Sequence, residues 1–278
     1  MGRYYISGLL MALAILSCTT ASAQIMSCGT KPSQWMIDYD THNPASIGRL
    51  ASLPKANKVF SVFAYICLNE DEQPVTTPAD IQTQIDKANV AFAPIGFSFK
   101  VCQTITVPDY RYRVIDEGTK LPELVDLYYK PEVINMYFTD TAQGDQGGPL
   151  DGFGFMPGAF DAIVLGSQAM KASSFSITHQ LGHFFGLYHT FETIFTPELA
   201  NGSNCQTAGD LVCDTEADPR GTVGSNCIHQ GPVADIQGNR YAPPYDNYMQ
   251  FQECGCRFTV QQYQRMYTIY TVGRNYLK

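Results

Sequence analysis

Three histidines stand at a spacing that suits one metal ion. The stretch THQLGHFFGLYHTF, residues 178–191, contains His179, His183 and His189. Residues four apart on a helix project from the same face, so the first two imidazoles can reach one ion. Gly186 can take a left-handed conformation, end the helix and let the third imidazole approach from another direction. Three neutral imidazoles with a fourth position left open form a typical catalytic zinc site.

An isolated histidine is more often an ordinary core or surface residue than a ligand. This chain has five histidines, and three of them lie in this one stretch around a glycine. His42 and His229 have no such company, and we expect them to be surface or loop residues. The grouping therefore favours a zinc site made by the other three.

Strands and helices that could position these histidines alternate from Lys58 onward. This alternation predicts an α+β fold with an α/β-type layered sheet. A capping box at Thr77, followed by Pro78, predicts a helix start, and Gly96 ends that helix. We expect strands over 59–68, 96–107, 133–140 and 161–167, and helices over 176–188 and 259–273.

Two segments carry no regular pattern of this kind. Residues 24–55 are polar and broken by prolines, and they predict an extended lead-in rather than a packed unit. The glycine-rich stretch 143–158 lacks the strand-then-helix context of a phosphate-binding loop, so we expect turns there. We place the domain boundaries at 24–55 for an N-terminal extension or pro-segment and 56–278 for the main domain.

The first 23 residues read as a targeting segment. Arg3 is followed by a short apolar run and then by the small residues Ala21-Ser22-Ala23, the pattern of a secretory signal peptide cleaved after Ala23. The alternative is a lipid anchor at Cys18. The apolar run is too short to span a bilayer, and we expect no transmembrane segment elsewhere. This pattern predicts a secreted, periplasmic or extracellular protein.

Charge and cysteine content narrow the class further. The formal net charge is −8 and no Lys/Arg cluster occurs, which excludes the electrostatic footprint of a nucleic-acid-binding protein. The chain has nine cysteines, and once Cys18 leaves with the signal peptide the remainder is even in number. In an exported chain these predict disulfides, concentrated between Cys205 and Cys256 in a loop-rich segment.

The histidine stretch resembles the metzincin zinc-peptidase signature, His-Glu-x-x-His-x-x-Gly-x-x-His followed by a methionine turn. The chain matches it at the three histidines and Gly186, and DNYMQF supplies a candidate turn at Met249. The gap before this turn, with CDTEADP (213–219) inside it, is similar to that of the pappalysin family and its cytophagalysin- and ulilysin-type members. The resemblance covers roughly residues 58–278.

This resemblance implies a zincin-like fold: a mixed twisted sheet, an active-site helix, a cleft and an irregular disulfide-stapled C-terminal subdomain. It implies that His179, His183 and His189 bind Zn²⁺ and that Met249 forms an apolar floor beneath the ion. The segment Gly152 to Leu165 would supply an upper-rim strand that pairs with an extended peptide.

Two further site features are also implied only by the resemblance. Some members bind calcium, and Asp210, Asp214 and Asp218 could supply oxygen ligands here. In members with a pro-segment, a cysteine thiolate takes the fourth zinc position and keeps the enzyme latent. Cys28 lies at the right place along the chain for this role, and the alternative for Cys28 is a disulfide.

The chain departs from the signature at two catalytic positions. Gln180 replaces the glutamate that moves protons in active members; an amide can hydrogen-bond water but cannot change its protonation state. Phe251 stands where a tyrosine would help to stabilise the tetrahedral intermediate. The interpretation is a secreted zinc-binding metallopeptidase-family protein that binds extended peptides with impaired catalysis. The alternative is an active peptidase with a substitute base, for which Glu192 is the candidate.

Overall fold

The computed structural model describes residues 27–43, 52–144, 147–221, 227–251 and 254–278. The predicted signal peptide and Cys18 lie outside these residues. Within them, no helix is both long enough and apolar enough to cross a membrane.

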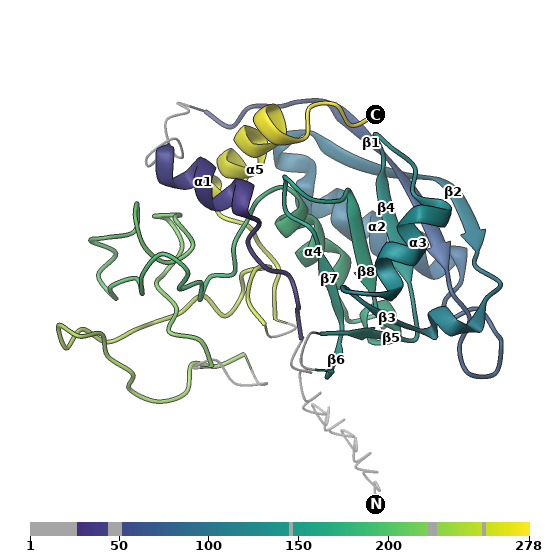
Figure 1. Ribbon diagram of the computed structural model, residues 1–278. Coiled ribbons are helices and arrows are strands. Elements are labelled where there is room, and N and C mark those ends of the chain that lie inside the picture. Colours follow the sequence, from purple (N-terminus) through teal and green to yellow (C-terminus); the bar gives the residue numbers. More distant parts are fainter. Residues whose placement is uncertain (1–26, 44–51, 145–146, 222–226, 252–253) are drawn as a thin grey trace, which may run out of the picture.

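Five strands form the central sheet in the order β2-β1-β4-β8-β7 (Figure 1). β1, β2, β4 and β8 are parallel, and the edge strand β7 runs antiparallel to β8. All residues of β4 and β8 are buried, as expected for strands covered on both faces. The four predicted strands are confirmed within a few residues. The bounds are Lys58–Ile66 for β1, Phe97–Thr106 for β2, Ile134–Phe138 for β4, Gly152–Gly154 for β7 and Ala162–Leu165 for β8.

Alternating side chains of this sheet build two separate cores. One face packs with α2 (Pro78–Phe92), α4 (Ser176–Phe184) and α5 (Val260–Gly273). The other face packs with α3 (Lys120–Tyr128). Successive residues of a strand point to opposite faces, which explains why Ala64 joins the first core and Tyr65 the second. The site helix α4 is thereby held against the sheet on its first face.

The predicted start of α2 is confirmed. Thr77 accepts a hydrogen bond from the Asp80 amide, and the Asp80 side chain accepts one from the Thr77 amide. The helix gives way at Phe92 to the 3₁₀ turn Ala93–Ile95, and Gly96 follows with φ of 69°. Only a residue that tolerates this left-handed conformation can turn the chain directly into β2.

Several short elements are absent from the predictions. A second sheet has the order β3-β5-β6, with β3 at Val114–Asp116, β5 at Thr141–Gln143 and β6 at Pro149–Leu150. β6 and β7 both fall in the stretch 143–158 that composition assigns to turns, although the resemblance implies a strand from Gly152 onward, where β7 begins. The 3₁₀ turns Tyr110–Arg113 and Ser167–Met170 complete the regular structure. Strands this short leave no clear alternation in a sequence.

The expectation of an extended, unpacked lead-in is wrong for residues 34–42. They form α1, Gln34–His42, with Ser33 as its N-cap. Met36 is fully buried, and Asp40 makes a buried ion pair with Arg265 of α5 at 2.6 Å. Tyr188 donates its hydroxyl to the same carboxylate. These long-range partners, which a local pattern cannot reveal, hold α1 beside α5 (Figure 1).

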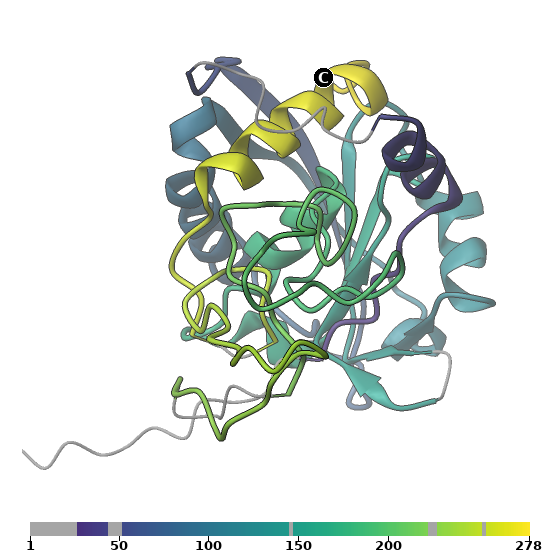
Figure 2. The ribbon, with the colours of Figure 1, turned by 90° about the vertical axis from the view of Figure 1, so that its left-hand side faces the viewer.

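Residues 185–258 form a loop region in which the described residues contain isolated bridges but no helix or longer strand. Figure 2 shows this region facing the viewer as coils. Two disulfides, Cys205–Cys213 and Cys227–Cys254, cross-link it, which confirms the predicted stapled segment. Among the described cysteines, Cys28, Cys67, Cys102 and Cys256 are unpaired.

Candidate metal centre

The histidine cluster forms because α4 ends just before Gly186. α4 ends at Phe184, earlier than the predicted 188, and Gly186 has φ of 86°. The Gly186 amide donates to the carbonyl of His183 and the Leu187 amide to that of Gly182, a Schellman cap. A Cβ on Gly186 would lie 2.7 Å from Ile269. The turn sends the chain back so that His189 reaches the helix face that carries the other two histidines.

The three imidazoles converge on one point. The Nε2 atom of His183 lies 3.0 Å from that of His179 and 3.1 Å from that of His189. The Nδ1 atoms of His179 and His183 face the carbonyls of Tyr248 and Leu187, each at 2.7 Å. A carbonyl can only accept, so each Nδ1 carries the proton and each of those two Nε2 lone pairs points inward.

Burial keeps these rings neutral. It lowers the pKa of His179 to about 4. It also lowers the pKa values of His183 and His189 well below the ordinary value, with neighbouring histidines adding to the effect. Neutral imidazoles whose lone pairs face each other repel, and a divalent cation between them removes that repulsion. The donor set therefore fits a zinc ion.

Cys28 joins the same cluster. Its Sγ lies 3.5 Å from the Nε2 of His183, and the sulfur and the three imidazole nitrogens all lie within 4.8 Å of one another. Burial raises the pKa of the Cys28 thiol, while hydrogen bonds from Thr30 and Gln180 oppose that rise. The structure contains no disulfide at Cys28. The thiol lies where a fourth ligand would stand.

Gln180 is held between the cysteine and Thr30. The Gly154 amide donates to the Thr30 hydroxyl, which donates in turn to the Oε1 of Gln180, both at 2.8 Å. This fixes the amide so that its Nε2 donates to the Cys28 sulfur at 3.2 Å. A carboxylate at position 180 would have no hydrogen to offer the sulfur.

Met249 and Phe251 lie on the loop-region side of the cluster. Met249 is fully buried under α4, where a Cβ on Gly182 would lie 2.5 Å from its sulfur. Phe251 meets the His189 ring edge-on at 5.0 Å between centroids and offers no donor. Tyr248 packs its ring against Phe175 and Phe258, so it does not replace the missing tyrosine.

The other two histidines and the expected calcium ligands lie outside this cluster. His42 binds the carbonyl of Asp38 at the exposed end of α1, and His229 lies in a loop. The expected calcium ligands Asp210, Asp214 and Asp218 are engaged separately with the protein. Among the described residues only the cysteine-histidine group forms a cluster of potential metal ligands, so the calcium expectation finds no support.

Sequence reasoning missed the residues that align the site from a distance. Thr30 orients Gln180, and Gly182 lets Met249 approach the helix. Asp218 accepts hydrogen bonds from Thr190, from the Gln250 side chain and from the Arg220 amide. The glycine inside the helical pattern was a usable signal for close packing, but nothing local marks the other partners.

Comparisons with known proteins agree with this site. The family model described as pregnancy-associated plasma protein-A, of the M43 peptidases, matches residues 154–271. An extracellular metalloprotease of Colletotrichum graminicola is 24% identical over 95% of this chain and 97% of its own length. One of Arthroderma gypseum is 25% identical over 91% and 86%.

A solved structure shares the fold. It is described as mature mirolysin of Tannerella forsythia in complex with a cleaved peptide, and it matches with a TM-score of 0.56 at 17% identity. The match covers 81% of this chain and 96% of that one. Together with the three histidines, the glycine turn and the methionine, these similarities support a pappalysin-like metzincin.

Proposed function

We propose that this protein is a secreted, zinc-binding member of its metallopeptidase family that binds extended peptides and hydrolyses them poorly. We further propose that Cys28 is the fourth zinc ligand and that residues 27–31 close the cleft. The observation that carries this proposal is the contact of Cys28 with His183 on one side and with the Gln180 amide on the other.

His179, His183, His189 and Cys28 would hold the ion. A bound zinc ion polarises carbonyl groups and makes water more acidic. Four protein ligands are typical of closed, structural zinc sites, whereas catalytic sites keep one position open. The Gln180 amide suits the closed state because it donates a hydrogen bond to a sulfur that a carboxylate would repel.

The two departures from the family signature explain the poor hydrolysis. A positioned general acid–base group typically contributes about 10²- to 10⁴-fold to a rate, and Gln180 cannot accept or release a proton. A hydrogen-bond donor to the oxyanion typically contributes about 10²- to 10³-fold, and Phe251 has none. Peptide binding depends on neither group, so the cleft can retain a chain that it does not cut.

The edge of the sheet supports peptide binding directly. Residues 27–29 pair with β7: the Gly29 amide donates to the carbonyl of Gly152 at 3.0 Å, and the Asp151 amide donates to that of Ser27 at 2.9 Å. Asp151 also accepts from the Ser27 amide. This is β-augmentation, in which an edge strand binds an extended segment through its backbone. The same strand would serve a peptide once residues 27–31 leave.

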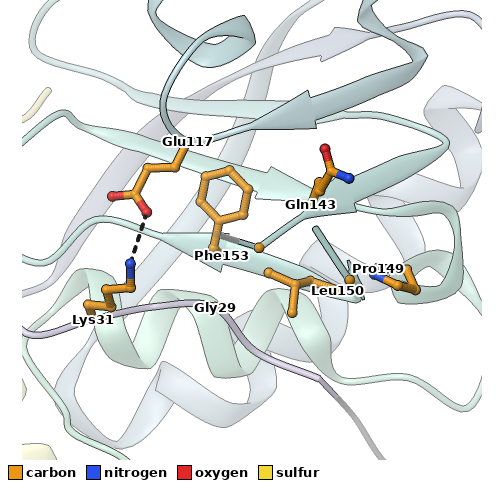
Figure 3. Close-up of a pocket in the computed structure, with 9 residues that line it drawn as sticks. Gly29, Lys31, Glu117, Gln143, Pro149, Leu150 and Phe153 are labelled. Atoms are coloured by element: carbon orange, nitrogen blue, oxygen red, sulfur yellow. Dashed lines mark ion pairs between the residues drawn. The ribbon is translucent and has the colours of Figure 1, made fainter. Parts of the chain in front are cut away.

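Side chains next to β7 fit this segment closely (Figure 3). A Cβ on Gly29 would lie 2.4 Å from the end of the Leu150 side chain and 3.4 Å from Phe153, so a larger residue would require Leu150 to shift. Beyond it, Lys31 pairs with Glu117 at 3.8 Å, in an ion pair that is largely exposed and therefore weak (Figure 3). The backbone bonds and the glycine contact, rather than this ion pair, hold the segment.

An active peptidase with Glu192 as its base is the competing function. Glu192 lines the same cavity as His189 and Cys28. Its Oε1, however, accepts the amides of Thr193 and Ile194, so the carboxylate is turned toward its own loop. This geometry favours the impaired enzyme.

Four forms of the protein test the proposal: the unaltered chain, Cys28→Ala, Gln180→Glu and the double variant. We expect one zinc ion in each by metal analysis. With a diverse peptide library, we expect the double variant to cleave about 10²- to 10⁴-fold faster than Cys28→Ala. Cys102→Ala, which removes an exposed thiol on β2, is the matched control and should change nothing.

Two results would count against this proposal. Cleavage by Cys28→Ala at the rate of the double variant would contradict impairment, and the loss of that cleavage on adding Glu192→Gln would then support the competing function. Mass-spectrometric mapping of thiol alkylation checks the closed site independently. Cys28 should react slowly in the zinc form and faster after chelation, whereas Cys102 should react at one rate throughout.

Export and the division of the chain belong to the same proposal. The relatives are named extracellular, and residues 1–23 have the composition of a signal peptide. We propose residues 24–55 as an extension that closes the cleft of the domain 56–278. The exported chain should begin at Gln24 on N-terminal sequencing; a start at Cys18 would indicate the lipid-anchored alternative.

A further inference from the structure

A second feature of the cleft is a cavity beside the histidine cluster. It measures about 500 Å³, and Lys31, His189, Phe191, Glu192, Arg220 and Phe251 are among the residues that line it. Residues 28–31 form one part of its lining, and His189, Phe191, Glu192, Arg220 and Phe251 remain as lining once residues 27–31 leave. Its charges are two cations and one carboxylate, in a chain whose net charge is −8.

Arg220 is the charged group that the protein leaves available in this cavity. Its guanidinium carbon lies 5.1 Å from the ring centroid of Phe251 and 5.3 Å from that of Phe191. By contrast, Arg257 of the loop region and Arg265 of α5 have carboxylate partners. Among the described residues no ion pair involves Arg220, which is exposed. Aromatic faces hold a guanidinium flat while its N–H groups stay free to donate.

The backbone of Arg220 is fixed to the frame of the metal centre. Its φ is 59°, a left-handed conformation that is costly for a residue with a side chain. The Arg220 amide donates to one oxygen of the buried Asp218 at 2.9 Å. The other oxygen accepts from Thr190 and Gln250, which follow His189 and Met249 in the chain. These bonds fix the Arg220 backbone relative to the histidines, and the rings of Phe191 and Phe251 lie against its guanidinium.

The one carboxylate in the cavity does not neutralise this cation. Glu192 turns its Oε1 to the amides of Thr193 and Ile194. Lys31 pairs with Glu117 and leaves with residues 27–31, so Arg220 is the cation that remains for a bound peptide. A carboxylate entering the cavity would meet a planar, preorganised guanidinium, which binds carboxylates through two parallel hydrogen bonds.

We propose that this cavity binds an aspartate or glutamate side chain of the peptide held in the cleft, and that Arg220 determines this specificity. The inference rests on the proposed peptide-binding function and names its ligand class. A charge-assisted hydrogen bond of this kind contributes about 10- to 100-fold in affinity.

The test uses the full zinc-loaded chain carrying Cys28→Ala, so that residues 27–31 can leave. Fluorescence anisotropy measures binding of labelled peptides that differ at a single position, with Asp, Glu, Asn, Gln or Lys at each site in turn. We expect one position at which Asp or Glu binds about 10- to 100-fold more tightly than Asn or Gln. Arg220→Gln should abolish this preference, and Arg220→Glu should shift it to Lys.

Arg240→Gln is the matched control, because Arg240 is an exposed arginine of the loop region that does not line the cavity. It should keep the preference for acidic residues. Zinc content identifies any variant that fails to fold, and Arg220→Lys then replaces Arg220→Gln, with a weakened preference expected. Peptides that bind without an acidic preference, or with one that survives Arg220→Gln, would overturn the inference alone. Binding of no peptide at all would overturn the proposed function as well.

Discussion

The sheet region and the loop region of this molecule are stabilised in different ways. The sheet region, residues 58–184 with α5, buries continuous apolar faces of strands and helices. The loop region, residues 185–258, has two disulfides and a set of side-chain-to-backbone hydrogen bonds instead. Yet the loop region supplies His189, Arg220, Met249 and Phe251 to the site.

The sheet region therefore contributes mainly to the stability of the fold, whereas the loop region contributes mainly to the positions of the site residues. Burial is not directional, so many apolar sequences could form the sheet region. Hydrogen bonds have narrow geometry, and several in the loop region fix residues at or beside the metal centre, such as those of His179 with the Tyr248 carbonyl and of Thr190 with Asp218. Breaking a buried contact of the sheet region should therefore lower global stability, whereas breaking a hydrogen bond of the loop region should mainly disturb the site locally.

The largest expected effect tests the sheet region. Arg274 is fully buried after α5, pairs with Asp161 before β8 and also donates to the carbonyls of Phe184 and Phe155. Arg274→Gln leaves Asp161 buried and unpaired, which should cost about 3 to 5 kcal/mol of unfolding free energy. Urea unfolding followed by circular dichroism measures this loss.

The control for Arg274→Gln is Arg257→Gln in the loop region. Arg257 pairs with Asp246 at 2.8 Å, but both side chains are partly exposed, and such pairs contribute about 0 to 1 kcal/mol. Equal losses for Arg274→Gln and Arg257→Gln would remove the proposed contrast between the two regions.

The next effect concerns a buried carboxyl in the loop region. Burial raises the pKa of Glu198 from 4.5 to about 7, and its Oε1 has no hydrogen-bond partner among the described residues. Because the folded pKa is the higher one, the native state binds more protons between these values. Stability should fall as pH rises from 4.5 to 7, by about 3 kcal/mol.

The substitution Glu198→Gln should remove this pH-dependent loss of unfolding free energy. The variant should unfold with about 3 kcal/mol more free energy than the unaltered chain at pH 8, and with little difference at pH 4. Denaturant titrations across this range provide the measurement, with Glu70→Gln as the control at an exposed carboxyl. Parallel curves for the unaltered chain and Glu198→Gln would show that this carboxyl does not control the pH dependence.

The smallest effect lies where the two regions meet. Thr259 caps α5 in a capping box with Gln262, and Gln262 exchanges hydrogen bonds with Asn247, which holds the Met249 amide. Thr259→Ala should cost about 1 kcal/mol. Hydrogen exchange should also quicken at residues 247–250. Thr77→Ala, at the equivalent cap of α2, should cost as much without affecting that turn.

The sequence predicted what local spacing determines. Four strands, the start of α2, the glycine turn at Gly186 and the three histidines need only neighbours within a few residues. α1 was missed as a packed helix because its partners, Arg265 and Tyr188, lie far along the chain. The end of α4 was placed too late because Phe184 and Leu187 continue the apolar pattern through the Schellman turn.

The contacts around the metal ligands could not be predicted from local spacing. Gln180 could be recognised as a departure, but its contacts with Thr30 and Cys28 join segments about 150 residues apart. The link from Asp218 to Arg220, Thr190 and Gln250 is likewise tertiary. Such contacts leave no periodic or compositional signal in the sequence, so only the folded chain reveals them.

Residues 27–31 belong to the same chain as the strand they cover. The packed helix α1 begins a few residues later and keeps them close to that strand. A tethered segment of this kind has an effective concentration of about a millimolar or more. While Cys28 also holds the segment at the metal centre, free peptides at micromolar levels would compete at roughly a thousandfold disadvantage. A backbone cut between Lys31 and Ser33 would end that advantage permanently. We therefore expect proteolytic processing, rather than peptide supply, to govern access to this cleft.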